Sequence, residues 1–516
     1  MRKISLLFIA MIILPLVTGV SPAVVHASPA KLKIISPHNE FIKDEYSRAF
    51  SAYYQTTYGE AVDFEWVDVG GTDADVRYIR SGFAATPSGI GIDLFWGGGV
   101  DPYIALAGEN LFEAYQVEAA ILNNIPKTLG GIPMYDSQYR WYGSALSGFG
   151  IIYNKQLLSQ KSFPEPKTWE DLSNPKLKGW VSSAGFESGT IHMMFEIMLQ
   201  GYGWDKGLRV ATLIGANVKN WPASSSAVPK AVSSGDVAYG LCIDFYAWAE
   251  ISKVGADKIG FVLPAKLTTI NPDSIAILKG APNMAVAKRF VSWVLTKQAQ
   301  RLWMQNVGTA FGPTKNVLGR MTVIPDLYTE IPASDNIVPV NPFKVSEQLA
   351  YNTTKGSVRY SLVTDLLTSL IVDSQDPLKI AWNDIIEANK TATQPSTKIS
   401  RAIDKLTEVP LLESAAMNLA KTWSDATVRN KYIADWHTFA RQRYADASSI
   451  AIYGASTADL QAQIDALNTQ VKAVQAQGQN NLYYGLGGGI LAGLVLGVAI
   501  MGLIGRRREV AAVEKK

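Results

Sequence analysis

Short apolar runs alternate with longer amphipathic segments between about residue 31 and residue 310. The runs have the length of strands, and the segments between them carry apolar side chains at helical spacing, as at Tyr46 and Phe50. This alternation predicts an α/β fold with mainly parallel sheets, in which ligands bind beyond the carboxyl ends of the strands. We predict strands at residues 32–35, 62–67, 92–96, 149–153, 237–243, 260–263 and 274–278.

The pattern changes after about residue 321, where strand-like runs give way to helical segments. The clearest of these segments lie at 363–372, 399–406 and 411–423, so we predict a helical extension over 324–450. A helical stalk is predicted over 456–481, because apolar residues repeat there at four-three spacing for two heptads. These residues are Leu460, Ile464, Leu467, Val471 and Val474.

Two further apolar segments lie at the ends of the chain. Residues 1–27 have the basic start, short apolar core and small-residue exit of a secretory signal peptide. Residues 482–505 carry no charge and precede Arg506–Arg508, which predicts one transmembrane helix with a cytoplasmic tail at 506–516. We therefore expect a cell-surface, extracytoplasmic protein that is anchored in the membrane by its C-terminal helix.

The composition fits a large folded ectodomain. Of the 516 residues, 47% are hydrophobic and 18% are charged, and the net charge of +3 gives no indication of nucleic-acid binding. Cys242 is the only cysteine, which excludes a disulfide within the chain. Its apolar neighbours predict a buried, unreactive thiol.

Several loops after predicted strands, or before predicted helices, have residues suited to ligand binding. Trp96 and the glycines that follow it expose backbone N–H groups, and Ser188–Thr190 precede a helix whose amino end would attract an anion. Asp244 and Tyr246 follow the Cys242 strand, where they could accept hydrogen bonds or bind a cation. Ordinary turns, helix caps and packing explain each of these fragments equally well when it is taken alone.

Catalytic motifs of the zinc-protease, serine-hydrolase, P-loop and C-x-x-C types are missing from the sequence. His38, at the end of the first strand, has a position in a predicted cleft, whereas His192 is expected to be a surface residue at a helix start. We therefore predict a protein that is not an enzyme and needs no cofactor.

Taken in order, seven motifs resemble those of the extracellular solute-binding proteins of family 1, which deliver ligands to ABC importers. They are IDLFWGGG at 92–99, GFGIIYNK at 148–155, PEPKTWEDL at 164–172, NPKLKG at 174–179, SGT at 188–190, SGDVAYG at 234–240 and ILKGAPN at 277–283. The segment 285–303 is also similar to the returning C-terminal helix of that family.

The resemblance implies a type II periplasmic-binding-protein fold, with two α/β lobes that close on a ligand about two crossover strands. Lobe 1 would comprise residues 31–140 and 271–323, and lobe 2 would be the inserted segment 141–270. The resemblance also assigns a set of ligand-facing residues to the cleft. These are His38, Asn39, Trp96, Gly97, Gly98, Ser147, Ser188, Gly189, Thr190, Ser225, Asp244, Tyr246, Asp273 and Ser274.

Ferric-ion-binding members of the family carry adjacent tyrosines where this chain has Phe245 and Tyr246. One phenolate is therefore missing, and an organic or phosphate-like anion is favoured over iron, although His38, Asp244 and Tyr246 could still hold a metal. Because few cationic residues occur in these loops, affinity would depend on backbone dipoles and closure. The expected partners are the solute, an ABC permease with its ATPase and the membrane; a surface sensor that uses the same cleft is the alternative.

Overall fold

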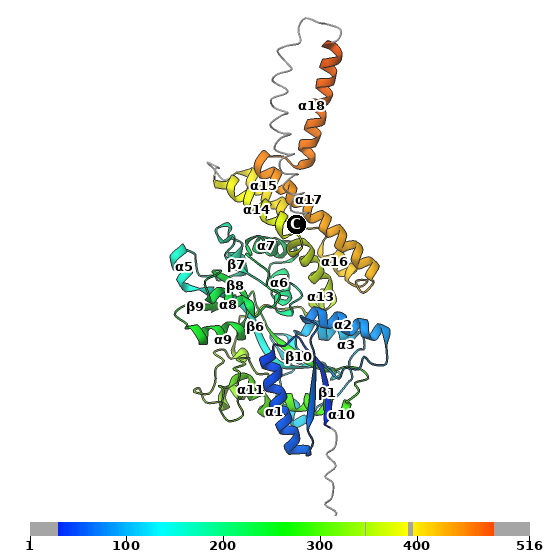
Figure 1. The fold of residues 1–516 in the computed structure, drawn as a ribbon, viewed down its shortest axis with the longest axis vertical. Coiled ribbons are helices and arrows are strands. Elements are labelled where there is room, and N and C mark those ends of the chain that lie inside the picture. Colours follow the sequence, from blue (N-terminus) through cyan, green and yellow to red (C-terminus); the bar gives the residue numbers. More distant parts are fainter. Residues whose placement is uncertain (1–28, 346, 391–395, 479–516) are drawn as a thin grey trace, which may run out of the picture.

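The computed structural model describes residues 29–345, 347–390 and 396–478, and Figure 1 shows their arrangement. The predicted signal peptide at 1–27, the predicted membrane helix at 482–505 and the tail at 506–516 lie outside the described residues and stay predictions. Within the described ranges, every helix is too short or too polar to span a bilayer.

Lobe 1 is built on three parallel strands. β1 (Ala30–Ile35) pairs with β2 (Val62–Val67) on one side and with β3 (Leu94–Trp96) on the other. A helix follows each of these strands, so the amino ends of the three helices lie at the carboxyl edge of the sheet. The helices of lobe 1 are α1 (Glu40–Tyr58), α2 (Thr72–Ala85), α3 (Val100–Gly108), α4 (Ala119–Leu122), α10 (Met284–Val294), α11 (Lys297–Met304) and α12 (Leu327–Glu330). A small hairpin of β4 (Thr128–Leu129) and β5 (Ile132–Pro133) completes the lobe.

Two long antiparallel strands, β6 (Tyr142–Asn154) and β10 (Ile270–Ile277), cross between the lobes. The strand order is β2-β1-β3-β10-β6-β8-β7, with β9 also paired to β6. β10 therefore joins the lobe 1 strands, while the second half of β6 pairs with the strands of lobe 2. This arrangement confirms the predicted two-lobed α/β fold. The prediction of mainly parallel sheets is wrong, because the crossover strands β6 and β10 pair antiparallel with all of their neighbours.

Lobe 2 surrounds the second half of β6. Its strands are β7 (Val181–Ser182), β8 (Tyr239–Ile243) and β9 (Ile259–Val262). Its helices are α5 (Lys155–Lys161), α6 (Gly189–Gly201), α7 (Trp204–Asn217), α8 (Ala227–Ser233) and α9 (Asp244–Val254). Cys242 is buried in β8, as predicted, and burial raises the pKa of its thiol well above the usual value.

Two predicted elements differ from those in the structure. The strand expected at 149–153 begins at Tyr142, because β6 runs through both lobes and is buried along its whole length. The single helix expected at 285–303 is two helices, α10 and α11. The break occurs because Thr296 turns into an extended conformation and caps α11, its side chain accepting a hydrogen bond from the Ala299 N–H at 3.2 Å.

From Thr353 onward the C-terminal extension is helical and covers lobe 2 on the side away from β6 (Figure 1). The predicted start at residue 324 is too early, because Ile324 and Leu327 pack in the core of lobe 1 and the chain up to residue 352 is mostly irregular. A π-helical turn at Thr368–Val372 follows its first helix. The helices are α13 (Thr353–Leu367), α14 (Gln375–Lys390), α15 (Thr397–Leu406), α16 (Glu413–Ala420), α17 (Ala426–Tyr453) and α18 (Thr457–Gly478).

The extension shares one hydrophobic core with lobe 2. Leu366 and Trp382 belong to the same buried cluster as Ile214 of α7. The indole of Trp382 donates a hydrogen bond to Asn217 Oδ1 at 2.8 Å. At Gly215, a Cβ atom would lie only 2.3 Å from Ile371 Cγ2, so glycine is needed for this close approach. The extension is therefore part of the folded body rather than an appended domain.

The ion pair between Glu196 of α6 and Arg359 of α13 is the most deeply buried contact between the extension and lobe 2. Both side chains are fully buried, and Arg359 Nη2 lies 2.7 Å from Glu196 Oε1. We predict that Glu196→Gln lowers the free energy of unfolding by about 3 kcal/mol, because the guanidinium loses a buried carboxylate. Chemical denaturation of the full-length chain measures this change.

The matched control is Glu65→Gln, which disrupts the exposed Lys33–Glu65 pair in lobe 1. This substitution is expected to cost less than about 1 kcal/mol. Equal costs for the two substitutions would contradict the importance assigned to the buried pair.

Candidate functional site

A cavity of about 470 Å³ opens between the two lobes. The loops after β1 and β3 line it from lobe 1, the starts of α6 and α9 line it from lobe 2, and the crossover strands lie at its floor. The lobes touch across its rim, where Asn39 Nδ2 donates to Tyr246 Oη at 3.3 Å and the Asp73 N–H donates to the Glu187 carbonyl at 3.4 Å. The structure thus holds the lobes in contact around the cavity.

Five helices begin at this cavity: α1, α2 and α3 from lobe 1, and α6 and α9 from lobe 2. N–H groups in the first turn of a helix have no acceptor within the helix, and the helix dipole gives this end a partial positive charge. Because several such ends meet at one cavity, their combined field favours a bound anion.

Two glycines allow these helix ends to approach closely. Gly98 has a φ of 90°, and a Cβ atom there would lie 2.5 Å from Thr72 Cγ2. A Cβ atom on Gly189 would lie 2.5 Å from Thr72 Oγ1. Thr72, at the start of α2, therefore contacts both the β3–α3 turn and the start of α6, and any larger residue at either glycine would push these elements apart.

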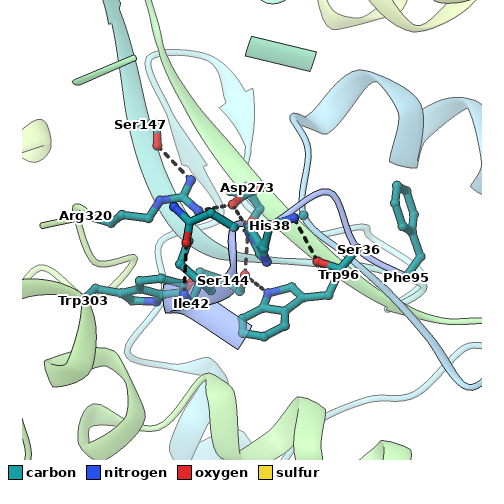
Figure 2. Close-up of polar contacts among 12 residues, drawn as sticks. Ser36, His38, Ile42, Phe95, Trp96, Ser144, Ser147, Asp273, Trp303 and Arg320 are labelled. Atoms are coloured by element: carbon teal, nitrogen blue, oxygen red, sulfur yellow. Dashed lines mark hydrogen bonds and ion pairs between the residues drawn. The ribbon is translucent and has the colours of Figure 1, made fainter. Parts of the chain in front are cut away.

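A buried cluster of charged and polar groups forms the floor of the cavity (Figure 2). Arg320 is ion-paired with Asp273 of β10, and its Nη2 donates to Ser147 Oγ of β6 at 2.9 Å. His38 Nε2 lies 2.8 Å from the same Asp273 oxygen, Oδ2. The guanidinium also lies over the ring of Phe245, 4.6 Å from its centroid. The cluster thus joins both crossover strands to lobe 1.

The charges of this cluster follow from its surroundings. Burial disfavours the ionised form of Asp273, but the charge of Arg320, together with the hydrogen bonds from Arg320 and His38, outweighs burial and lowers the pKa of this carboxyl to about 2. Burial lowers the pKa of His38, although Asp273 opposes the shift. At neutral pH, His38 is therefore neutral and its Nε2–H donates to Asp273. Its Nδ1 atom is then an acceptor, which has no partner among the described residues.

Strand alternation explains the direction of Asp273. Neighbouring residues of a strand point to opposite faces, so Asp273 lines the cavity whereas Ser274 is fully buried behind it. The register between the two crossover strands shifts at this point, with Asp273 opposite Ala145 and Ser274 opposite Gly143, so the extra residue of this β-bulge is Ser144 of β6.

The structure brings ten of the fourteen predicted ligand-facing residues to the cavity wall. They are His38, Asn39, Gly98, Ser147, Ser188, Gly189, Thr190, Ser225, Tyr246 and Asp273. A role in ligand binding stays a prediction for each of them.

The other four predicted residues, Trp96, Gly97, Asp244 and Ser274, lie behind the wall. Trp96 is fully buried in the core, and its indole donates to Ser144 Oγ at 2.8 Å. Gly97 packs against the back of the His38 ring. Asp244 is also fully buried, and its carboxylate accepts the N–H groups of Gly148 at 2.6 Å and Phe245 at 2.7 Å. Because its carboxylate is buried and bonded to backbone N–H groups, Asp244 has a structural role rather than a place in the cavity wall. Burial raises the pKa of Asp244 to about 7.

Sequence reasoning missed several residues of the wall, above all Arg320. This arginine lies in an irregular segment between α11 and α12, so no strand or helix end marked it. The available signal was its isolation among the apolar residues Leu318, Met321 and Val323, because an arginine in such a run is usually buried and paired. The expectation that the cleft contains few cationic groups therefore omitted its central cation. Thr72, Gly99, Glu187 and Asn271 were also missed.

His192 is not a surface residue, contrary to the prediction. It is fully buried on α6, and its Nδ1 lies 2.9 Å from Thr364 Oγ1 of α13. The prediction failed because the extension covers this face of α6, and nothing in the local sequence reveals that cover.

The metal alternative named His38, Asp244 and Tyr246 as possible ligands. These three side chains do not converge, because the Asp244 carboxylate is turned to backbone N–H groups. Across the part of the chain that the structure describes, no group of three or more His, Cys, Asp or Glu side chains is placed to hold a metal ion.

Comparison with known proteins agrees with the family that the sequence motifs resemble. The family described as bacterial extracellular solute-binding protein matches residues 51–324, which is more than half of the chain. The phosphoglycerate transport regulatory protein PgtC of Salmonella typhimurium is 27% identical over 292 residues, or 56% of this chain and 67% of that protein. The Fe(3+)-binding periplasmic protein of Serratia marcescens is 24% identical over 255 residues, or 47% of this chain and 72% of that protein.

Solved structures share the fold. The periplasmic binding protein P5PA superposes with a TM-score of 0.54 at 20% identity, covering 66% of this chain and 99% of that one. AfuA from Actinobacillus pleuropneumoniae, with exogenous fructose-6-phosphate bound, gives a TM-score of 0.51 at 18% identity, covering 66% of this chain and 98% of that one. At these identities the similarity establishes the two-lobed fold.

The low pKa of Asp273 predicts an acid-sensitive contribution to stability. The folded-state pKa of about 2 is below the unfolded value of about 3.9, so the contribution is present above pH 4 and is lost as the pH falls towards 2. Between pH 7 and pH 2, the free energy of unfolding of Asp273→Asn should fall by on the order of 2 kcal/mol less than that of the parent protein. Thermal unfolding of the full-length chain between pH 2 and pH 7 measures the slope.

Asp63→Asn, which changes an exposed carboxyl on β2, is the control and should leave the slope as it is in the parent protein. The same slope in Asp273→Asn as in the parent protein would show that the carboxyl is not held ionised by Arg320.

Proposed function

The chain belongs to the bacterial extracellular solute-binding proteins, the ligand-capturing components of ABC transporters, and we propose that its ligand is a small phosphorylated organic acid. One observation carries this proposal: five helix amino ends and the guanidinium of Arg320 meet at a single interlobe cavity. Helix amino ends and arginine are the two groups that proteins most often use to bind phosphate oxygens.

The charges around the cavity leave Arg320 as its central cation. Glu40 and Asp68 at the rim are both paired with Lys43, each at 3.0 Å. The carboxylate of Glu187 lies over Gly185, where a Cβ atom would come within 2.4 Å of Oε2. Asp273 and Ser147 accept hydrogen bonds from the terminal nitrogens of Arg320, while its Nε is buried and has no hydrogen-bond partner among the described residues.

The cavity also suits the organic part of such a ligand. Phe149, Phe245 and Met193 supply apolar surface, while Asn271 and the neutral His38 supply polar atoms for hydroxyl or carboxyl groups. Its volume of about 470 Å³ is within the usual range for small-molecule sites. The relationship to a phosphoglycerate transport regulatory protein supports this class of ligand.

Ferric ion is the second candidate, because Tyr246 and His38 both line the cavity and an Fe(3+)-binding protein is among the relatives. Their metal-binding atoms, however, already have partners: Tyr246 Oη accepts from Asn39, and His38 Nε2 bonds to Asp273. Phe245 provides no second phenolate. A phosphorylated acid therefore ranks first.

We further propose that the protein captures its ligand without chemical turnover and passes it to a permease at the cell surface. The apolar segment 482–505 would anchor it there, with the N-terminus outside and the C-terminus in the cytoplasm. A surface sensor that uses the same cavity, with the helical extension as its output, is the alternative to transport.

Calorimetric titration of the full-length chain with 3-phosphoglycerate, fructose-6-phosphate, inorganic phosphate and ferric citrate tests the ligand class. We expect 3-phosphoglycerate, the phosphorylated acid, to bind more tightly than inorganic phosphate or fructose-6-phosphate. The double variant Arg320→Met/Asp273→Asn removes both charges together and should weaken that binding about ten- to a hundred-fold, as expected for losing charge-assisted hydrogen bonds.

The control is Arg301→Met/Glu330→Gln, which removes a more exposed ion pair of the same lobe and should leave affinity unchanged. Binding of ferric citrate, with no response to the phosphorylated compounds, would overturn the proposal in favour of the metal alternative.

A further inference from the structure

α13 of the extension contacts both lobes, not only lobe 2. Figure 1 shows this helix between α6 of lobe 2 and the α2–α3 pair of lobe 1. The crossover strands β6 and β10 and the rim contacts of Asn39 and Asp73 also join the lobes, so α13 is an additional connection, which lies beside the cavity rather than at its floor.

The contacts with lobe 2 are deeply buried. Arg359 forms the fully buried ion pair with Glu196, and its Nη1 also lies 2.7 Å from Glu413 of α16. One turn further along α13, Thr364 bonds to His192, whose ring lies 3.9 Å from the ring of Tyr360. These contacts fix α13 to α6.

The contacts with lobe 1 come from other residues of the same segment. Tyr351 donates a hydrogen bond to Asp101 of α3, and Arg80 Nη1 of α2 donates to Ser361 Oγ at 3.1 Å. Arg77 of α2 lies 3.3 Å from Asp365, which is itself held by Arg429 of α17. α13 thus touches α2, α3 and α6 at the same time.

These contacts lie close to the residues that line the cavity. Asp101 is two residues after Gly99 on α3, and His192 is two residues after Thr190 on α6. On α2, Asp73 follows Thr72 directly and is ion-paired with Arg77. The contacts of α13 and of Tyr351 therefore lie on the helices α2, α3 and α6, within about two turns of the residues that line the cavity.

We propose that α13 is an interlobe brace, which holds α2 and α3 against α6 and keeps the cleft closed before the ligand arrives. The bridging residues Tyr351, Ser361 and Asp365 are then positioning residues for ligand binding. Opening would separate α13 from lobe 1, because its buried ion pair with Glu196 fixes it to lobe 2. The inference rests on the two-lobed binding function but not on the identity of the ligand.

The brace would raise the observed affinity for the ligand. A binding protein that is mostly open in the absence of ligand loses affinity in proportion to the fraction of molecules in the closed state. A braced protein avoids this loss because its helix ends are already assembled. If loosening the brace lowers the closed fraction to about a tenth, the observed Kd rises about ten-fold.

Gly356 offers a direct way to loosen the brace. This glycine of α13 faces α3, and a Cβ atom there would lie 2.2 Å from both Asp101 Oδ2 and Tyr351 Oη. Gly356→Leu should therefore push α13 away from lobe 1. The matched control is Val358→Leu, two residues along the same helix at a side chain that is 42% exposed.

The readout is the distance between spin labels on the two lobes of the full-length chain, measured without ligand. Gln55→Cys on α1 and Lys230→Cys on α8 are both exposed sites, and the native Cys242 is only 1% exposed, so labelling is selective. We expect one short interlobe distance in the parent protein and in Val358→Leu, and a shift to longer distances in Gly356→Leu. The Kd for the tightest ligand found by calorimetry should rise up to ten-fold in Gly356→Leu, the wedge variant, and should stay unchanged in Val358→Leu.

A second variant covers the case in which the wedge prevents folding. Tyr351→Phe with Ser361→Ala removes two hydrogen bonds to lobe 1 without adding bulk and should lengthen the same distance. If Gly356→Leu folds, an unchanged distance in it would overturn the proposed brace. If it does not fold, an unchanged distance in the double variant would do so. So would a ligand-free parent protein with the same long distances as the wedge variant. Because these measurements need no ligand, they decide the brace even if no phosphorylated compound binds.

Discussion

The ion pair between Arg320 and Asp273 fixes the floor of the cleft. Its partners come from four parts of the chain: β10 supplies Asp273, β6 supplies Ser147, the β1–α1 loop supplies His38, and the segment after α11 supplies Arg320. A buried charge without a partner is strongly destabilising, so each element must keep its place for the pair to persist. The same constraint leaves a cation at the point where the two crossover strands meet lobe 1.

More of the fold than of the site could be predicted from the sequence. Strand and helix patterns gave the alternating α/β order, because apolar periodicity is a local property that the folded structure retains. The break at Thr296 was missed, since a helix cap inside an apolar pattern changes the chain direction without changing periodicity. The long β6 was underestimated because glycines and serines at 143–148 obscure a strand that is nevertheless fully buried.

The site shows a different limit. Residues in loops at strand and helix ends were placed near the cavity correctly, as with Asn39 and Thr190, since topology determines where such loops meet. Trp96 and Ser274 were assigned to it wrongly because neighbouring residues on a strand point to opposite faces, and the sequence does not show which face meets the cavity. Arg320 is distant in sequence from every loop it joins, so only the tertiary structure brings it to the cleft.

The helices that begin at the cavity and the C-terminal extension are joined by direct contacts. The proposed binding of an anion would depend on the mutual position of α2, α3 and α6, and the segment of α13 contacts all three behind the cavity. From α13, the path continues through Asp365 to Arg429 and Trp423, and so into α17 and α18. A separation of the lobes would therefore act on α13 and, through it, on the helices that lead towards the C-terminus. The described contacts therefore connect the helices at the cavity to α17 by way of α13 and Asp365.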